Sequence, residues 1–436
     1  MYREKIEELI QWKNSKDRMP LIIRGARQVG KTWLMKEFGK TQYKQYAYIN
    51  FDNNERMNKL FDGNYDIARI IQGLKIETSI DIEPENTLII FDEVQEIPKA
   101  LSSLKYFCEN NREYHIIASI SLLGVALHEG TSFPVGKVDF LDLYPLNFKE
   151  FAIASGKENL MKLIDKKEYE LIKTFKEQYI DMLKEYYYIG GMPSAVNTYI
   201  ETKSYIQVRN VQLRILESYE QDFSKHAPKE IVPRIKMLWN NIPTQLAKEN
   251  KKFIYGLIRE GARAKDYEHA LSWLIDCGLV HKVNRVTKPS IPLVAYQDFE
   301  AFKIYFLDVG LLSAMTRIDV KTILEGSSIL TEFKGALTEQ FVLTELISNK
   351  DIPVFYWSAE RATAEVDFLV QIEGKNIPIE VKAEENLRAK SLKIYMEKYD
   401  SKVNVRTSMA DFKEQDSLFN IPLYAVHNIQ NILGNM

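Results

Sequence analysis

The chain has 436 residues, a formal net charge of −2 and two cysteines, Cys108 and Cys277. This length exceeds what one hydrophobic core serves, so we expect about two to four domains. Two distant cysteines exclude a disulfide framework and a cysteine-rich zinc site, and they fit a reducing cytoplasm. No apolar stretch approaches the length that crosses a bilayer, and the near-neutral charge gives no global signature of nucleic-acid binding. The composition predicts a cytoplasmic multidomain protein without membrane contact.

Up to about residue 151, short apolar strands alternate with helical segments. This alternation predicts an α/β domain with a mainly parallel sheet. The expected strands are Leu21–Arg24, Ala47–Phe51, Thr87–Asp92, His115–Ala118 and Val138–Tyr144.

The first expected strand runs into a loop that fits the pattern G-x-x-x-x-G-K-[ST], which is typical of phosphate-binding loops. Its glycines let the backbone N–H groups turn toward phosphates, and the following helix aims its N-terminus at the anion. We expect Lys31 to be exposed until it neutralises phosphate charge, and the Thr32 hydroxyl to bind Mg²⁺. The loop predicts ATP binding by Gly25, Ala26, Arg27, Gln28, Val29, Gly30, Lys31 and Thr32.

The expected strand at Thr87 closes on two adjacent carboxylates, Asp92 and Glu93. The C-terminal end of a central parallel strand is where ligands bind in such domains. We expect Asp92 to hold the Mg²⁺ shell and Glu93 to polarise the attacking water. The alternative is a buried strand that ends at a solvated acidic turn, but the upstream phosphate-binding loop favours catalysis. The two motifs predict a Mg²⁺-dependent ATP hydrolase.

Residues 156–228 are rich in Lys, Glu, Leu and Tyr at helical spacing, which predicts a helical lid broken by a turn at Gly190–Pro193. The next segment, residues 229–308, is expected to be a winged helix-turn-helix. Its expected helices and strands are Ile231–Lys248, Ala264–Cys277, Lys282–Val286 and Phe302–Leu307.

Between residues 229 and 290, basic residues outnumber acidic ones by six. Arg263 and Lys265 fall at the start of the expected recognition helix, so DNA contact is one interpretation. The alternative is a packing module with solvated lysines, because winged helices often serve protein contacts.

Residues 309–436 predict a further α/β domain with a second carboxylate constellation. Its expected helices are Gly335–Leu346 and Leu387–Tyr399, and its expected strands are Val354–Ser358, Glu365–Ile372 and Asn376–Lys382.

Four polar residues in this domain follow one another on a helix and a hairpin: Glu339, Asp367, Glu380 and Lys382. Strand alternation puts Glu380 and Lys382 on one face, with Asp367 on the neighbouring strand. Carboxylates that bind Mg²⁺ beside a lysine that activates water suit phosphodiester cleavage, which is the layout of PD-(D/E)xK nucleases. We therefore expect Glu339, Asp367 and Glu380 as metal ligands and Lys382 as a catalytic group. The alternative is ordinary salt bridges at the strand edges.

Nearly end to end, the chain resembles the prokaryotic AAA-type ATPases that carry a C-terminal domain of unknown function with a restriction-endonuclease-like fold. The resemblance implies ATP binding and a layout of ATPase, winged helix and nuclease-like fold. With the lid, we expect an AAA-type P-loop NTPase core over 1–155, the helical lid over 156–228, the winged helix over 229–308 and the PD-(D/E)xK nuclease-like domain over 309–436. The matching stretches are the phosphate-binding loop, Phe91–Glu93, Ser132–Gly136, Tyr144–Leu146, Gly190–Pro193, Leu307–Leu312 and Glu365–Phe368.

Two positions depart from the family's pattern. Relatives tend to have a Gly-Ser pair where this chain has Ile120-Ser121, and Ser121 is the expected γ-phosphate sensor. A β-branched side chain at Ile120 is expected to shift the backbone and slow hydrolysis. Relatives often carry Gly-Arg where this chain has Gly136-Lys137, and lysine is a non-bidentate substitute for arginine.

The leading hypothesis is a cytoplasmic ATPase whose nucleotide state repositions a DNA-binding, nuclease-like half. The alternative is a nucleotide-gated regulatory or scaffolding protein whose C-terminal fold binds a partner without cleavage. A third option is a homo-oligomeric remodelling motor with an arginine supplied across a subunit boundary. The candidates for that arginine are Arg112, Arg209 and Arg214.

Overall fold

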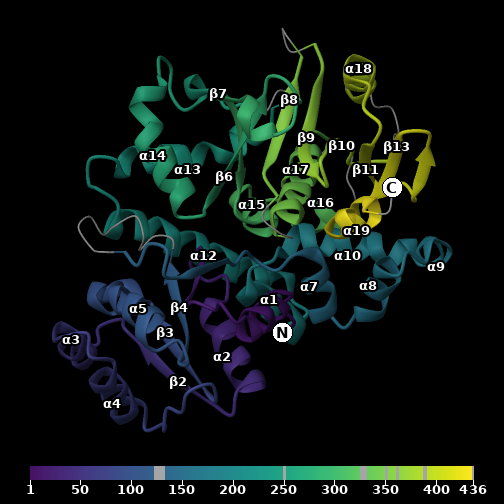
Figure 1. Ribbon diagram of the computed structural model, residues 1–436. Helices are drawn as coiled ribbons and strands as arrows, with labels where there is room; N and C mark the ends of the chain where they lie inside the picture. The colour runs from purple at the N-terminus through teal and green to yellow at the C-terminus, as the bar shows by residue number, and fades with distance from the viewer. Residues whose placement is uncertain are drawn as a thin grey trace. The chain divides into compact units, whose positions relative to one another are not determined.

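The computed structural model of the protein describes residues 1–121, 133–248, 252–324, 331–348, 352–359, 363–385 and 390–434. These residues divide into two compact units, and Figure 1 labels most of their helices and strands. Unit 1 is Met1–Tyr144 with Asp276–Gly278, and unit 2 is Pro145–Ile275 with Leu279–Met436. In the described residues, no helix is long and apolar enough to span a membrane.

The described strands of unit 1 form a five-stranded parallel sheet in the order β2-β3-β4-β1-β5. This confirms the prediction of an α/β fold with a mainly parallel sheet. The strands are β1 (Leu21–Gly25), β2 (Gln45–Asn50), β3 (Thr87–Asp92), β4 (His115–Ser121) and β5 (Asp139–Asp142). The helices are α1 (Lys5–Asn14), α2 (Lys31–Gln42), α3 (Glu55–Asp62), α4 (Ile67–Thr78), the 3-10 turn η1 (Val94–Glu96) and α5 (Pro98–Asn110).

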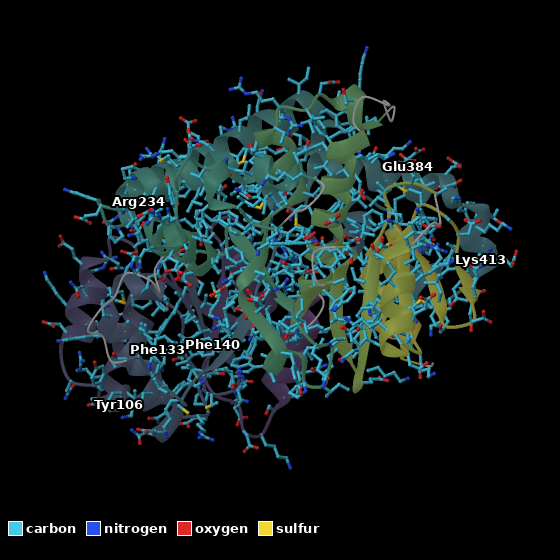
Figure 2. All side chains as sticks on the ribbon, turned by 90° about the horizontal axis from the view of Figure 1, so that it is seen from above. Tyr106, Phe133, Phe140, Arg234, Glu384 and Lys413 are labelled. Atoms are coloured by element: carbon cyan, nitrogen blue, oxygen red, sulfur yellow. The ribbon has the colours of Figure 1, made fainter. Side chains whose placement is uncertain are left out.

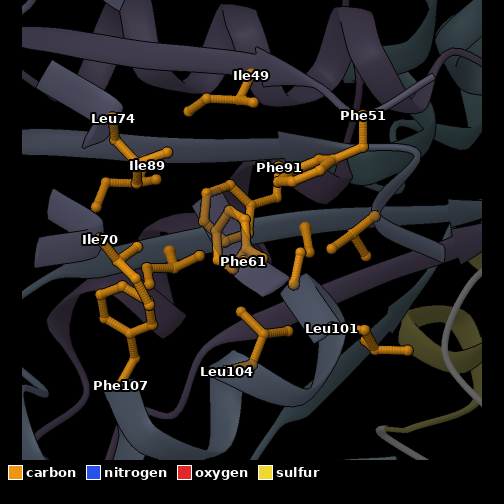
Figure 3. Close-up of a cluster of buried hydrophobic side chains, with 14 of the residues drawn as sticks. Ile49, Phe51, Phe61, Ile70, Leu74, Ile89, Phe91, Leu101, Leu104 and Phe107 are labelled. Carbon is orange, nitrogen blue, oxygen red and sulfur yellow. The ribbon is translucent and has the colours of Figure 1, made fainter. Parts of the chain in front are cut away.

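A hydrophobic core covers one face of this sheet (Figure 3). Ile89 and Phe91 of β3 enter it and meet Phe61 of α3, Leu74 of α4 and Leu104 of α5. Helix α2 packs against β1, β2, β3 and β4. Because side chains alternate along a strand, Asp92, the residue after Phe91, points to the opposite face from this core. The Asp92 carboxylate therefore lies at the C-terminal end of the buried strand β3.

Unit 2 begins with helices alone in its described residues from 148 to 226, in the region predicted as a helical lid. They are α7 (Phe148–Ala154), α8 (Glu158–Asp165), α9 (Tyr169–Thr174), α10 (Lys176–Ile189), α11 (Pro193–Thr202) and α12 (Tyr205–His226).

The predicted turn between α10 and α11 is a tightly packed junction. Gly190 has φ of 72°, and a Cβ there would collide with the Asp308 carboxylate. A Cβ at Gly191 would collide with the Leu146 carbonyl. The Asp308 carboxylate is buried and accepts hydrogen bonds from the N–H of Gly191 at 2.6 Å and of Leu311 at 2.8 Å. Both glycines are therefore required by close packing.

The described strands of unit 2 form an eight-stranded sheet in the order β12-β13-β11-β10-β9-β8-β6-β7. They are β6 (Val280–Val286), β7 (Gln297–Phe306), β8 (Val354–Ser358), β9 (Glu365–Ile372), β10 (Lys375–Val381), β11 (Asn404–Ser408), β12 (Lys413–Gln415) and β13 (Leu418–Pro422). The accompanying helices are α13 (Val232–Leu246), α14 (Ala264–Asp276), α15 (Val309–Met315), α16 (Val320–Leu324), α17 (Thr331–Ser348), α18 (Lys390–Tyr399) and α19 (Ile429–Leu433), with 3-10 turns at Tyr255–Leu257, Leu293–Tyr296 and Leu423–Asn428.

The antiparallel ribbon expected as a wing is part of this larger sheet. Strand β6 pairs with β7 on one side and, in parallel, with β8 on the other, where Arg285 lies opposite Tyr356. The expected boundary between residues 308 and 309 therefore separates strands that hydrogen bond to one another. The first residues of the helix expected at 387–399 and Ser132 lie outside the described residues.

Candidate functional site

The predicted phosphate-binding loop connects β1 to α2 in unit 1. A Cβ at Gly25 would collide with the Leu143 carbonyl oxygen, and Gly30 has φ of 97° at the N-cap of α2. Glycine is therefore required at the two positions for different reasons: at Gly25 the backbone of Leu143 comes too close for a Cβ, and at Gly30 the backbone is left-handed. Within the loop, Ala26 and Val29 are buried, Arg27 is half-buried and Gln28 is exposed. Gln28 also has a left-handed φ of 67°.

Lys31 is buried, contrary to the expectation that it is exposed before nucleotide arrives. Its ammonium donates hydrogen bonds of 3.0 Å to the carbonyl oxygens of Gly25 and Ala26. Burial lowers the pKa of Lys31 to about 8, against the opposing effect of the Glu93 and Asp92 carboxylates. The Lys31 ammonium thus binds the backbone of its own loop. To contact a phosphate, it must give up its hydrogen bonds to the carbonyl oxygens of Gly25 and Ala26.

Thr32 and Asp92, the two expected Mg²⁺ ligands at this site, lie together. The Thr32 hydroxyl donates a 2.8 Å hydrogen bond to Oδ2 of Asp92. The Tyr48 hydroxyl donates to the same oxygen at 2.8 Å, and the Ser119 hydroxyl donates to Oδ1. Burial and the hydrogen bond to Asp92 raise the pKa of Tyr48. The sequence analysis missed Tyr48 and Ser119, although both lie on strands next to β3.

Glu93 follows at a sharp turn, with a left-handed φ of 53°. Its backbone N–H donates to the Ser119 hydroxyl at 3.0 Å. The side-chain amide of Gln95 donates to Oε2 of Glu93 at 2.5 Å and to the Ser121 hydroxyl at 3.5 Å. Gln95 is buried and connects the expected catalytic base to the expected phosphate sensor. Gln95 was also missed, although it lies two residues after the acidic pair.

Ile120 and Lys137, the two departures from the family's pattern, have defined surroundings in unit 1. Ile120 is buried in the core of unit 1, and β4 pairs with β1 without a register shift through Ser121. The Ile120 side chain is therefore accommodated in the core while β4 keeps its regular pairing with β1. The Lys137 ammonium forms a 3.0 Å ion pair with Glu109 of α5.

The residue before the loop is fixed by its own contacts. Arg24 forms hydrogen bonds of 2.8 and 2.7 Å with the Asp142 carboxylate. Its guanidinium lies 4.4 Å from the centre of the Phe140 ring, which stacks on Phe133. Figure 2 labels these two phenylalanines next to each other. These contacts tie the end of β1 to β5 and support the start of the loop.

The three arginines considered for a neighbouring subunit differ in exposure. Arg112 is exposed, and its Nε donates to the Cys108 carbonyl at 2.7 Å. Arg214 is exposed on α12. Arg209 donates to the Ser313 hydroxyl at 3.1 Å and the Ile318 carbonyl at 3.0 Å, so its guanidinium is engaged within unit 2.

In unit 2, Asp367 and Glu380 lie on the adjacent strands β9 and β10. Oδ2 of Asp367 accepts a 2.8 Å hydrogen bond from the N–H of Val381, and Lys382 forms a 2.7 Å ion pair with Oε1 of Glu380. Burial raises the pKa of Asp367 well above its usual range, and the neighbouring carboxylates of Glu339 and Glu380 raise it further. Burial also raises the pKa of Glu380, against the effect of Lys382. The buried Glu380, the half-buried Asp367 and one lysine of the predicted constellation therefore come together.

Glu339 on α17 interacts with these carboxylates and with a tyrosine beside them. Its Oε2 accepts a 3.3 Å hydrogen bond from the buried Tyr305 hydroxyl. Within the described ranges, no three His, Cys, Asp or Glu side chains form a group that could hold a metal ion. The expected set of three carboxylates around one cation is thus not formed by these residues.

Lys303 of β7 also belongs to this cluster and was missed. Its side chain is 1% exposed, and its ammonium lies 2.5 Å from Oε1 of Glu365. Burial alone would lower the pKa of Lys303, but the carboxylates of Glu365, Glu339 and Asp367 raise it above its usual value. No sequence pattern connects β7 with β9, because their meeting depends on the tertiary fold.

Three family models match the chain. A model described as an AAA domain matches residues 17–152, which form an AAA-type P-loop ATPase domain. A domain of unknown function (DUF8612) matches residues 180–322, and another (DUF4143) matches residues 334–426. No curated protein sequence matches the chain.

Several solved structures are similar to the chain. The Walker-type ATPase of Pyrococcus abyssi is 13% identical over 73% of this chain and 96% of that chain, with a TM-score of 0.46. The ADP form of the ORC2 protein of Aeropyrum pernix is 15% identical over 74% and 92%, with a TM-score of 0.31. The RuvB Holliday junction branch migration motor of Thermotoga maritima is 12% identical over 67% and 91%, with a TM-score of 0.30.

Proposed function

We propose that the protein binds ATP with Mg²⁺ at the β1–α2 loop of unit 1 and hydrolyses it there. The observation that carries this proposal is the 2.8 Å hydrogen bond between the Thr32 hydroxyl and the Asp92 carboxylate, beside Glu93. Both groups are hard oxygen donors of the kind that Mg²⁺ prefers, and a buried carboxylate gains from a nearby cation. The residues therefore fit a nucleotide-bound Mg²⁺, which supplies charge neutralisation at the phosphates.

Each residue of the site has a proposed role. The backbone from Gly25 to Thr32 cradles the phosphates, and the Lys31 ammonium neutralises them after leaving the loop carbonyls. Glu93 orients the attacking water and accepts its proton, while Ser121 contacts the γ-phosphate. Gln95 holds the Glu93 carboxylate in place. Tyr48 and Ser119 orient Asp92 through its two oxygens.

Paired variants test this proposal. Glu93→Gln should bind ATP normally and hydrolyse it at least about tenfold more slowly, since a water-orienting base is lost. Asp92→Asn should weaken the Mg²⁺-dependent part of ATP binding, measured by calorimetry with and without Mg²⁺. The matched control is Glu109→Gln, which removes a surface carboxylate that pairs with Lys137. Wild-type hydrolysis by both site variants would refute the assignment.

A second function is proposed for unit 2, as a DNA-binding, PD-(D/E)xK nuclease-like half. It is favoured by Asp367 and Glu380 lying together, because Oε2 of Glu380 is buried without a hydrogen-bond partner among the described residues. Mg²⁺ is often held by one or two carboxylates with water completing its shell, so these two groups fit it. Lys382 would help to activate water, and the exposed Arg263 and Lys265 would contact DNA phosphates.

Cleavage of plasmid DNA with Mg²⁺ or Mn²⁺ tests this second function. Asp367→Asn and Glu380→Gln should abolish cleavage, while ATP hydrolysis at the separate unit 1 site stays at its wild-type rate. The double variant Arg263→Ala/Lys265→Ala should weaken DNA binding and reduce its salt dependence. If DNA is neither bound nor cut by the wild-type protein, the nucleotide-gated scaffolding function is favoured instead.

A further inference from the structure

The carboxylate cluster of unit 2 contains a cation of its own. Lys303 extends from β7 into the region where α17, β9 and β10 bring carboxylates together, and its side chain is 1% exposed. Its ammonium pairs with Glu365 at 2.5 Å and interacts with Glu339 and Asp367. A lysine is rarely so deeply buried unless it is paired with acidic groups.

Charge balance gives this lysine a clear role. When all are ionised, the four carboxylates of Glu339, Glu365, Asp367 and Glu380 and the two ammonium groups of Lys303 and Lys382 leave two net negative charges. That remainder matches one divalent cation. Without Lys303 the cluster would carry three negative charges in a buried place, where like charges strongly repel one another.

We propose that Lys303 is the internal counter-cation of this cluster and competes with a divalent cation for its carboxylates. This inference rests on the proposed cation site at Asp367 and Glu380. The Lys303 ammonium repels an incoming divalent cation and neutralises the carboxylates that would bind it. A divalent cation therefore binds more weakly here than the carboxylates of Asp367 and Glu380 alone would allow. The competing group comes from β7, a strand on the other side of the predicted domain boundary.

Binding of Mn²⁺ alone to the full-length protein tests this competition, with free Mn²⁺ measured by electron paramagnetic resonance. Lys303→Met should bind Mn²⁺ at least about tenfold more tightly than wild type, because a nearby positive charge is removed from a partly screened interior. Lys303→Arg keeps the charge and should bind as wild type does. Lys402→Met removes the same charge from an exposed pair with Asp400 and should also leave binding unchanged.

A further comparison of variants tests whether the added Mn²⁺ affinity comes from the carboxylate cluster. The tighter binding of Lys303→Met should disappear in Lys303→Met/Glu380→Gln, which removes a proposed ligand. If Lys303→Met does not fold by circular dichroism, Lys303→Met/Glu365→Gln removes the matching negative charge. That double variant should then bind Mn²⁺ more tightly than Glu365→Gln alone.

The outcomes separate the inference from the proposed function. Equal or weaker Mn²⁺ binding by folded Lys303→Met overturns the competition, while the cation site stands if the wild-type protein binds Mn²⁺. Tighter binding without any DNA cleavage supports the competition and refutes the nuclease function. Absence of Mn²⁺ binding in both proteins overturns both the competition and the cation site.

Discussion

The side-chain amide of Gln95 donates a 2.5 Å hydrogen bond to the carboxylate of Glu93, the proposed catalytic base. The same amide lies 3.5 Å from the hydroxyl of Ser121, the proposed phosphate sensor. A group placed between a base and a sensor can fix the orientation of both. We therefore treat Gln95 as a positioning residue of the ATP site.

Gln95→Leu should lower kcat for ATP hydrolysis by roughly tenfold and change ATP affinity by less than about twofold. The reason is that a mispositioned base loses transition-state contacts and few ground-state contacts. Steady-state kinetics and calorimetry measure the two quantities. Gln95→Glu should slow hydrolysis as well, because a second carboxylate would repel the Glu93 carboxylate and could not donate the hydrogen bond that now holds it. Equal losses in kcat and affinity would instead indicate general damage to the site.

ATP binding should weaken as the pH rises above about 8. The pKa of Lys31 is lowered from 10.5 to about 8, so its ammonium deprotonates in this range. Because phosphates favour the charged form, binding at pH 9 must be accompanied by proton uptake. Affinity should fall by up to about tenfold per pH unit until the pKa of the complex is reached.

Calorimetry in two buffers of different ionisation enthalpy measures that proton uptake directly. Lys31→Arg provides the control, because a guanidinium stays charged throughout this range. Its ATP affinity should be flat between pH 7 and pH 9.5. A flat profile in the wild-type protein would contradict the role assigned to the Lys31 ammonium.

Replacing Ile120 should destabilise unit 1 without raising ATP turnover. Ile120 is buried in the hydrophobic core, so Ile120→Ala leaves a cavity and should cost about 2–5 kcal/mol of unfolding free energy. Ile116→Ala on the same strand and in the same core is the matched control. Urea unfolding and turnover per folded molecule are the measurements. Faster hydrolysis in Ile120→Ala alone would restore the view that this side chain hinders the phosphate sensor.

The Asp308 carboxylate should make unit 2 less stable as the pH rises. Burial raises its pKa from 3.8 to about 6, against the hydrogen bonds from backbone N–H groups. The native state therefore holds a proton that the unfolded state releases between these two values. The free energy of unfolding should decrease from about pH 4 to pH 6, by up to about 3 kcal/mol.

Subtracting the pH profile of Asp308→Asn from that of the wild type isolates this group. The Asp308→Asn variant should be less stable than wild type at pH 4, because asparagine offers one acceptor oxygen to the N–H groups of Gly191 and Leu311. Its loss of stability between pH 4 and pH 6 should be smaller than that of wild type. Parallel profiles for the two proteins would show that this carboxylate does not titrate in the window.

Much of the ATP site could be predicted because its residues fall in two motifs that are each short and local in the sequence. The loop from Gly25 to Thr32 and the strand that ends at Asp92 follow local patterns, and the predicted β3 bounds match the structure. Tyr48 and Ser119 could not be predicted in the same way. Their roles depend on which strands flank β3, and the order β2-β3-β4-β1-β5 is a property of the tertiary fold.

The second cluster shows the same limit more strongly. Periodicity placed Glu380 and Lys382 on one face of a strand, and their 2.7 Å ion pair agrees with that placement. No sequence pattern predicted Lys303 in this cluster, because it lies in a segment expected to be a separate wing. Tyr305 of the same strand was missed for the same reason, although its hydroxyl donates to Glu339.

The pairing of β6 with both β7 and β8 also limits which parts of this protein can be exchanged by recombination. A fragment that starts at residue 309 would leave the edge of β8 unpaired where β6 now covers it. An open edge of apolar residues such as Phe355, Tyr356 and Trp357 is a site for aggregation. A gene fusion or deletion that moves the C-terminal segment must therefore carry residues 280–306 with it. The segment that has to move as one piece is therefore longer than residues 334–426, which the DUF4143 model matches.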